Sequence, residues 1–211
     1  AAPRLDDLEC VFAATKAFLA GENQENVTVL ALFDNEEIGS LTRQGADSTF
    51  LGDVLERVAL SCGKDREGLY RAIAGGFMLS ADNAHAVHPD SPEKSDPTNR
   101  CYLNEGVVVK HSPRYASDAL TAGVFQAICQ RAGVPVQVFA NRADEPGGST
   151  LGNLLSHAVS IPMVDIGMAQ LAMHAAVETA GSQDPEHLSR ACTAFFEANF
   201  TQCADGRYVL G

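Results

Sequence analysis

The feature that most constrains the fold is an apolar run at residues 27–33 that ends abruptly in acidic residues. The run, Val-Thr-Val-Leu-Ala-Leu-Phe, is nearly continuous in apolar and β-branched side chains, a pattern typical of a strand covered on both faces by helices. Asp34, Glu36 and Glu37 follow within four residues. Ionised carboxylates in an apolar neighbourhood need a cation, a hydrogen-bond donor or a proton to offset their desolvation. The run therefore predicts a buried strand that ends in either a metal site or a solvated acidic turn.

Helical and strand patterns alternate along the rest of the chain. Apolar residues recur at helical spacing over residues 5–20, and Gly21 provides a stop signal. Further strands are expected at residues 77–81, 107–110, 136–140 and 161–167, and further helices at residues 50–58, after Ser117, at 151–159 and at about 185–200. Because the connections are short, this alternation predicts an α/β fold with a mixed, largely parallel sheet flanked by helices.

Acidic residues and one histidine recur at the ends of these predicted elements. The side chains concerned are Asp6, Glu36, Glu37, Asp82 and His174. The carboxyl ends of strands in an open α/β sheet are where ligands usually bind, and oxygen and imidazole donors suit zinc, manganese and cobalt. This set matches a two-metal hydrolase. The alternatives are a helix cap for Asp6, a turn for Asp82 and a core position for His174.

Composition excludes several classes of partner. The 15 basic and 27 acidic residues give a net charge of −12, which argues against nucleic-acid binding and against attachment to an anionic membrane. No apolar stretch approaches the roughly 20 residues that span a bilayer. The six cysteines lack any Cys-x-x-Cys spacing. They favour free thiols in a reducing cytoplasm over a disulfide framework.

The length and apolar content predict one domain over residues 1–211. With 211 residues and 45% apolar side chains, the chain can bury a substantial core. It begins at Ala1 without an initiator methionine, and its first residues have the pattern of a structured region. We therefore expect the first part of a longer protein to be absent.

Five sequence blocks combine these candidate residues with their neighbours. They are Pro-Arg-Leu-Asp at residues 3–6, Phe-Asp-Asn-Glu-Glu-Ile-Gly-Ser at 33–40, Ser-Ala-Asp-Asn-Ala-His-Ala-Val-His-Pro at 80–89, Arg-Tyr-Ala-Ser at 114–117 and Gln-Leu-Ala-Met-His at 170–174. In this order, the blocks resemble the aspartyl aminopeptidase family of dinuclear metallopeptidases. The resemblance covers nearly the whole chain. It implies the α/β/α sandwich of zinc peptidases.

The resemblance also implies a role for each candidate site residue. Asp6 would bridge two metal ions, Glu36 would be the general base, and Glu37, Asp82 and His174 would each bind one ion. The ions would be zinc, with manganese or cobalt as alternatives. Asp7 competes with Asp6 for the bridging role. The family binds one of its metals through a further histidine, which would lie upstream of this chain.

The resemblance extends to substrate and assembly. His85, Lys110 and Tyr115 resemble positions that line the pocket for the substrate's first side chain. A cation and a phenol there would favour an N-terminal Asp or Glu, whereas a surface charge at a strand end is the alternative for Lys110. The family also carries an inserted β-rich domain upstream and assembles into a dodecamer, so we expect a homo-oligomer.

The sequence thus predicts a metal-dependent aminopeptidase that removes an acidic N-terminal residue from peptides. Two alternatives remain. One is another two-metal amide hydrolase, such as a deacylase or a carboxypeptidase-like enzyme. The other is a non-catalytic fragment or assembly piece that lacks the upstream metal ligand.

Overall fold

A mixed sheet forms the centre of the molecule. The computed structural model describes residues 1–145, 147–203 and 207–211. The strand order of the central sheet is β1 (Met78–Ala81), β5 (Met163–Gly167), β3 (Val107–His111) and β4 (Val136–Ala140). The pairs β1–β5 and β3–β4 are parallel, and the pair β3–β5 is antiparallel. The predicted mixed, largely parallel sheet is therefore confirmed.

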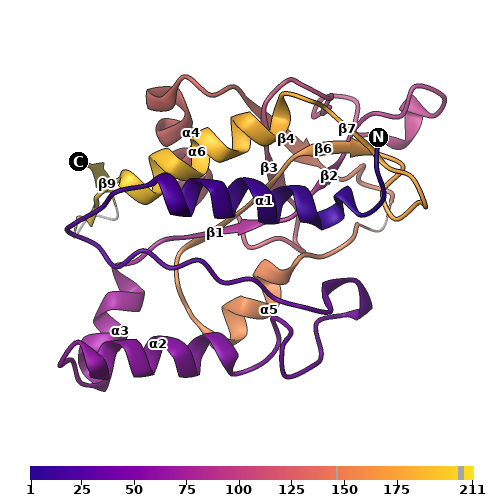
Figure 1. Cartoon of the computed structure of the whole chain (residues 1–211). Helices are drawn as coiled ribbons and strands as arrows, with labels where there is room; N and C mark the ends of the chain where they lie inside the picture. The colour runs from indigo at the N-terminus through magenta and orange to yellow at the C-terminus, as the bar shows by residue number, and fades with distance from the viewer. Residues whose placement is uncertain (146, 204–206) are drawn as a thin grey trace.

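Helices lie on both sides of this sheet (Figure 1). On one side lie α1 (Leu5–Ala20), α4 (Ala119–Ala132) and α6 (Asp184–Glu197), and on the other lie α2 (Phe50–Ser61), α3 (Arg66–Ala74) and α5 (Leu151–Ala158). Five of these helices were predicted from sequence periodicity, whereas α3 was not. The α/β/α arrangement is thus present.

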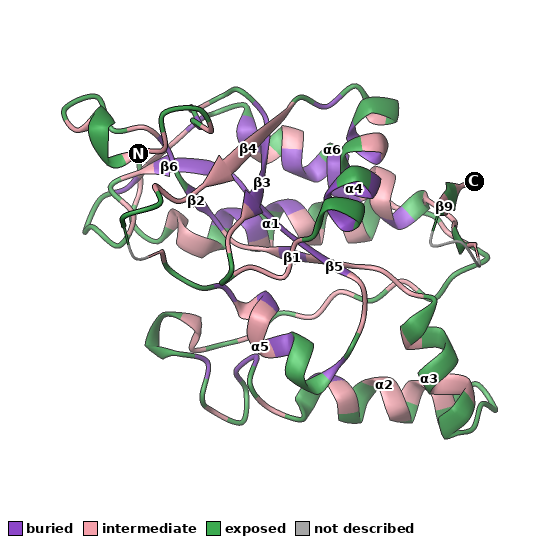
Figure 2. Cartoon of the chain, turned by 180° about the vertical axis from the view of Figure 1, so that it is seen from behind, coloured by how far each residue is buried: buried purple, intermediate pink, exposed green. Residues whose placement is uncertain are grey.

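The pleat of the strands divides the core between the two helical layers. Val164 and Ile166 of β5 pack in one cluster with residues of α1, α4 and α6, whereas Met163 packs with Leu155 of α5. Successive side chains of a strand point to opposite faces of its sheet. Both faces of β5 are therefore buried, as Figure 2 shows.

The remaining elements are short. They are η1 (Glu36–Ile38), β2 (Ala84–His85), η2 (Pro92–Lys94), β6 (Ala169–Leu171), β7 (Thr179–Ala180), β8 (Phe200–Gln202) and β9 (Tyr208–Leu210). β2 pairs in parallel with β6, and β6 pairs antiparallel with β7. Because β2 follows β1 and β6 follows β5, this second sheet continues the chain beyond the carboxyl ends of two neighbouring strands.

Most predicted elements are confirmed. Gly21 ends α1, and its N–H bonds to Ala17. Asp118, one residue after the expected Ser117, caps α4 because its carboxylate accepts from the N–H of Thr121.

None of the described helices combines the length and the apolar character that crossing a bilayer requires. The cysteines are free thiols.

The strand predicted at residues 27–33 is wrong for the structure of this chain. These residues form neither helix nor strand, and Val27, Val29 and Leu32 are exposed. The sequence pattern suits a strand, but a strand forms only where a neighbouring backbone offers hydrogen bonds. In the described part of the chain, no strand pairs with this segment.

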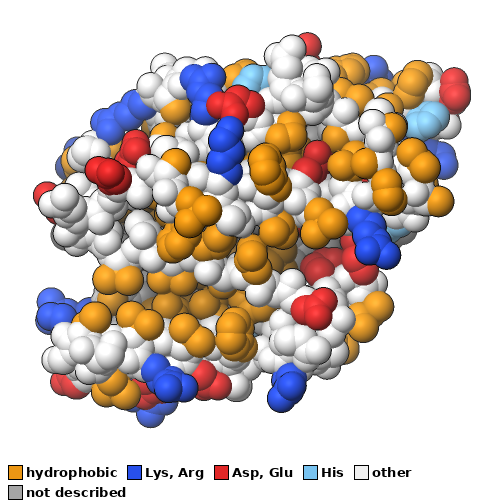
Figure 3. All heavy atoms as spheres, viewed as in Figure 1, with side chains coloured by type: hydrophobic (Ala, Val, Ile, Leu, Met, Phe, Trp, Pro, Cys, Tyr) orange, Lys and Arg blue, Asp and Glu red, His pale blue; other side chains and the backbone are white. Residues whose placement is uncertain are grey.

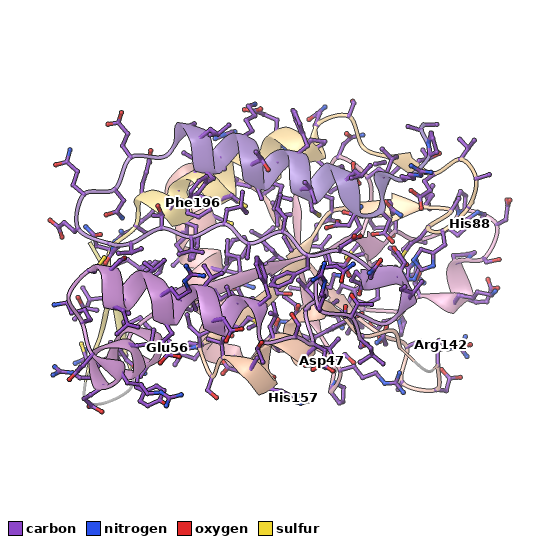
Figure 4. The ribbon with its side chains drawn as sticks, turned by 60° about the horizontal axis from the view of Figure 1, so that its bottom comes forward. Asp47, Glu56, His88, Arg142, His157 and Phe196 are labelled. Atoms are coloured by element: carbon purple, nitrogen blue, oxygen red, sulfur yellow. The ribbon has the colours of Figure 1, made fainter. Side chains whose placement is uncertain are left out.

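An apolar groove of about 630 Å³ separates residues 27–33 from β1. Its other walls come from α1 on one side and from α2 and α5 on the other. Figure 3 shows orange apolar side chains along the hollow between α1 and α2. In Figure 4, residues 21–33 run between α1 and α2, with Phe196 and Glu56 on either side. The sheet thus ends at β1 beside an open apolar space.

Candidate metal centre

The end of β1 positions Asp82. The N–H of Asp82 continues the ladder to the carbonyl of Ile166 at 3.0 Å. A Cβ at Gly167 would overlap the carbonyl oxygen of Asp82, so only glycine permits this close approach of β5. The packing of two strand ends therefore fixes the place where the Asp82 side chain leaves the sheet.

The first group of candidate ligands joins three distant segments. His174 Nε2 lies 3.1 Å from Asp6 Oδ2 and 3.0 Å from Glu37 Oε2. Asp6 comes from the first turn of α1, Glu37 from η1, and His174 from the loop after β6. The Asp6 side chain is 3% exposed, whereas the other two are half-exposed or more. The three residues offer donor atoms that lie within 4.8 Å of one another.

A second group shares Asp6 with the first. Asp6, Asp7 and Asp82 also offer oxygen atoms within 4.8 Å of one another. One carboxylate common to two adjacent donor groups is the arrangement needed to bridge two ions. The structure therefore brings together the four predicted ligands Asp6, Glu37, Asp82 and His174, and it places the competing Asp7 beside them.

Two carboxylate oxygens of this donor set lack the interactions that a bound metal ion would supply. Asp6 Oδ1 and Asp7 Oδ1 are buried and accept no hydrogen bond from the described residues. A buried carboxylate oxygen without a donor is costly. A divalent cation would supply the missing interaction, and carboxylates with an imidazole are ordinary zinc ligands.

Crowded carboxylates make this region hold protons when no cation is bound. Burial raises the pKa of Asp6 to about 8, and the charges of Asp82 and Glu37 add to the effect. Burial also raises the pKa of Asp7, again with a contribution from Asp82. The charge of Lys110 opposes both shifts but does not cancel them. A bound cation would stabilise the ionised carboxylates and displace the protons.

Glu36 lies beside these groups with a different electrostatic character. Burial raises its pKa to about 7, followed by repulsion from Asp82 and Glu37. It belongs to neither group of clustered donor atoms. A carboxylate with a pKa near neutrality can both take and release a proton at physiological pH.

The three predicted substrate-pocket residues lie near Asp82 or near one another. Lys110 Nζ lies 3.2 Å from Asp82 Oδ2 and 5.5 Å from the centre of the Tyr115 ring. Burial disfavours the charge of Lys110, yet Asp82 and Tyr115 together raise its pKa. The pKa of His85 is lowered, mainly by burial and then by Lys110 and His174. Lys110 is thus a buried, charged group rather than a surface charge.

The second histidine of this stretch points elsewhere. His88 follows β2 in an exposed loop, and its Nδ1 accepts a hydrogen bond from the N–H of Asp90 at 3.2 Å. Figure 4 shows it at an outer edge of the molecule. The spacing of His85 and His88 therefore does not form a separate cluster of metal donors in the described chain.

Sequence reasoning missed the groups that hold the ligand-bearing segments together. Asn83 Nδ2 donates to Gln170 Oε1 at 2.8 Å, to Glu9 Oε1 at 2.9 Å and to the carbonyl of Leu5 at 3.2 Å. These bonds tie α1, the turn after β1 and β6 to one side chain. Asn83 lies in a recognised sequence block, but no periodicity or spacing indicates its partners.

Two buried acids have similar roles. Glu178 accepts from the N–H groups of Asp6 and His174. Asp165, in β5, accepts from Thr150 Oγ1 at 2.8 Å and from the N–H of Ala116. It therefore anchors both the loop that carries Tyr115 and the start of α5. The only sequence signal for Glu178 is its position four residues after His174.

Comparison with known proteins finds a matching family. Residues 1–196 match the family described as Aminopeptidase I zinc metalloprotease (M18). A curated relative, "Probable M18 family aminopeptidase 2" of Clostridium acetobutylicum, is 48% identical over 195 residues, which are 92% of this chain and 45% of the relative. The chain thus spans about half the length of the curated relatives it matches.

Solved structures show the same fold. A chain of the cryo-EM structure of the Ape4 and Nbr1 complex superposes with a TM-score of 0.87 at 35% identity, covering 92% of this chain and 38% of that one. The S. cerevisiae mApe1 dodecamer gives a TM-score of 0.80 at 33% identity, covering 92% of this chain and 45% of that one.

Proposed function

The chain belongs to the M18 family of aminopeptidase I zinc metalloproteases, and on this premise we propose that it supplies the catalytic metal centre of an aminopeptidase acting on peptides. The observation that carries the proposal is the convergence of Asp6, Glu37, Asp82 and His174 around buried carboxylate oxygens to which no described residue donates a hydrogen bond. These residues come from four separate segments. A shared metal site explains why these four segments bring their donor groups to one place.

In this proposal the cluster would hold two zinc ions. Asp6 would be shared between them, and Glu37, Asp82 and His174 would each bind one. When bound, such ions polarise the scissile carbonyl and increase the acidity of the attacking water. Manganese and cobalt accept the same donors. The identity of the metal is therefore established by metal analysis of the purified protein and not by the donor set.

Glu36 is the proposed general base. Its raised pKa supports a carboxylate that accepts a proton from the attacking water and later gives it to the leaving amine. The neighbouring Glu37 touches His174 instead. The two adjacent glutamates therefore divide between proton transfer and metal binding.

We propose that the pocket for the substrate's first side chain is lined by His85, Lys110 and Tyr115, and that it favours Asp or Glu. The buried, charged Lys110 supports this preference because a cation can pair with a substrate carboxylate. Its present partner is Asp82. A metal ion on Asp82 would share that carboxylate's charge and weaken the hold on Lys110.

The catalytic unit, in this proposal, includes polypeptide beyond these 211 residues. The groove lies between β1 and residues 27–33, with helices on its other two sides, which is the environment of a central strand. The relatives are about twice as long as the chain. A strand from that additional polypeptide would fill the groove, and the same polypeptide would carry the further histidine ligand and the inserted β-rich domain implied by the resemblance.

Assembly and location follow as part of the same proposal. The printed title of one solved relative describes a dodecamer, which supports a homo-oligomer for this protein. The free thiols support a reducing compartment, and we propose the cytoplasm.

The test compares the chain alone with the chain co-expressed with the part of the C. acetobutylicum relative outside the match. We expect two zinc ions per complex and faster hydrolysis of Asp- and Glu-p-nitroanilide than of Leu-p-nitroanilide. Cleavage of N-acyl amino acids instead would indicate a deacylase. A complex that binds no metal and cleaves nothing would identify an assembly piece.

A further inference from the structure

A single buried carboxylate contacts the main chains of two candidate ligands. Glu178 Oε2 accepts a hydrogen bond from the N–H of Asp6 at 3.0 Å, and Glu178 Oε1 accepts one from the N–H of His174 at 2.6 Å. The residue is 2% exposed. Asp6 and Glu178 are 172 positions apart in the sequence. The carboxylate therefore links the N-terminal segment to the loop after β6.

The main chain of Glu178 strengthens this link. Its N–H donates to the carbonyl of Ala2 at 2.9 Å, and its carbonyl accepts from the N–H of Ala2 at 3.0 Å. The pair is an isolated antiparallel bridge. The segment before Asp6 is thus held by the backbone of Glu178, while Asp6 itself is held by the side chain.

The conformation of His174 shows why such support matters. His174 has a φ of 66°, in the left-handed region that residues with a Cβ occupy at a cost. Ala172, two residues earlier, is also left-handed. The side chain of His174 is largely exposed, so burial does little to hold it. The bond from its N–H to Glu178 holds the backbone from which the imidazole reaches Asp6 and Glu37.

We propose that Glu178 is a positioning residue of the metal centre: its carboxylate holds the backbones of Asp6 and His174 so that their side chains converge on one ion. This inference rests on the proposed function. Glu178 itself does not touch the ion, because both of its oxygens point to main-chain N–H groups. It acts through the two ligands.

We call the two hydrogen bonds from the Glu178 carboxylate to the N–H groups of Asp6 and His174 the clamp. Even a conservative substitution of Glu178 should disrupt it. A glutamine at this position offers one carbonyl oxygen and one NH₂ group, so one of the two N–H groups would face another donor. An aspartate keeps both oxygens but is shorter by one methylene. Neither replacement can make both bonds from the same backbone position.

The experiment titrates Co²⁺ into the 211-residue chain and follows both affinity, by competition with a chelator, and the visible absorption of the bound ion. We expect Glu178→Gln to weaken Co²⁺ binding by about 10- to 100-fold and to alter the absorption bands. The matched control is Asp184→Asn. Asp184 is also a buried carboxylate that accepts from two main-chain N–H groups, those of Asn104 and Gly106, but it holds no candidate ligand.

The outcomes separate this inference from the proposed function. Equal affinity and equal spectra for Glu178→Gln and the unmodified chain would overturn the positioning role. If the unmodified chain binds no Co²⁺, the metal proposal fails for this chain alone. Amide hydrogen exchange then tests whether Glu178 holds the backbones of Asp6 and His174. We then expect faster exchange at Asp6 and His174 in Glu178→Gln than in Asp184→Asn at matched global stability. Unchanged exchange at both amides would overturn the clamp.

Discussion

Lys110 Nζ lies 3.2 Å from Asp82 Oδ2, and the lysine side chain is only 2% exposed. The same carboxylate belongs to the candidate metal cluster. Lys110 and a metal ion are therefore two positive charges that compete for one acid, and the state of Asp82 depends on both.

Lys110→Met should destabilise the metal-free chain by about 3 kcal/mol, because it leaves a mostly buried carboxylate without its cation. Urea unfolding measures this loss. Saturating Zn²⁺ should reduce it, since the ion provides a replacement charge. The control is Lys16→Met: Lys16 pairs with Glu186 at 2.6 Å on the surface, so we expect a loss below about 1 kcal/mol. Equal losses for the two variants would contradict the competition.

Glu36→Gln and Glu37→Gln should separate proton transfer from metal binding. In the active complex, Glu36→Gln should keep the metal content and lower kcat by about 10²- to 10⁴-fold. Glu37→Gln should lose metal affinity, because its carboxylate lies within the cluster around His174. Metal analysis and steady-state kinetics on the same samples provide the measurement. Full activity in Glu36→Gln would exclude it as the base.

Glu9 should make stability fall as pH rises. Burial raises its pKa to about 7 from the ordinary 4.5, while a hydrogen bond from Asn83 opposes the shift. The folded state therefore binds the proton more tightly than the unfolded state, so the cost of ionising Glu9 is absent below pH 4.5 and complete above about pH 7. Its size is on the order of 3 kcal/mol.

Glu9→Gln removes this titration and keeps an oxygen that can accept from Asn83. We expect the free energy of unfolding of this variant to fall less than that of the unmodified chain between pH 4.5 and 8. Urea unfolding at a series of pH values tests the difference. Parallel pH profiles for the two proteins would show that Glu9 does not carry the effect.

Filling the groove should order residues 27–33. Their amides should exchange rapidly in the chain alone and become protected when the remaining part of the relative is co-expressed, because an added strand would supply hydrogen bonds. Val29→Lys should weaken co-purification, since Val29 lines the groove. Leu120→Lys is the control, because Leu120 is equally exposed but lies on α4, outside the groove.

Two results would contradict the proposal that additional polypeptide fills the groove. If the chain alone forms a dimer in which residues 27–33 are protected, a second copy fills the groove. If co-purification is unaffected by Val29→Lys, the additional polypeptide binds elsewhere. Light scattering and hydrogen exchange distinguish these cases.

The sequence predicted most of the fold because its signals are local. Helical spacing identified α1 and α6, and short apolar runs identified β1, β3 and β5. These patterns reflect which face of an element is buried, and that face is encoded by residues a few positions apart. The failure at residues 27–33 has the same cause: local pattern records the preference for a strand, but not whether a neighbouring strand is present.

The candidate site divides in the same way. Sequence patterns were enough to identify the donors at the ends of elements, namely Asp6, Glu37, Asp82 and His174. The tertiary structure was needed to show that these donors meet, that Lys110 pairs with Asp82 and that Glu178 holds the backbones of Asp6 and His174. Those relationships depend on contacts between residues far apart in the chain, and such contacts are set by the packing of whole elements rather than by the residues next to them.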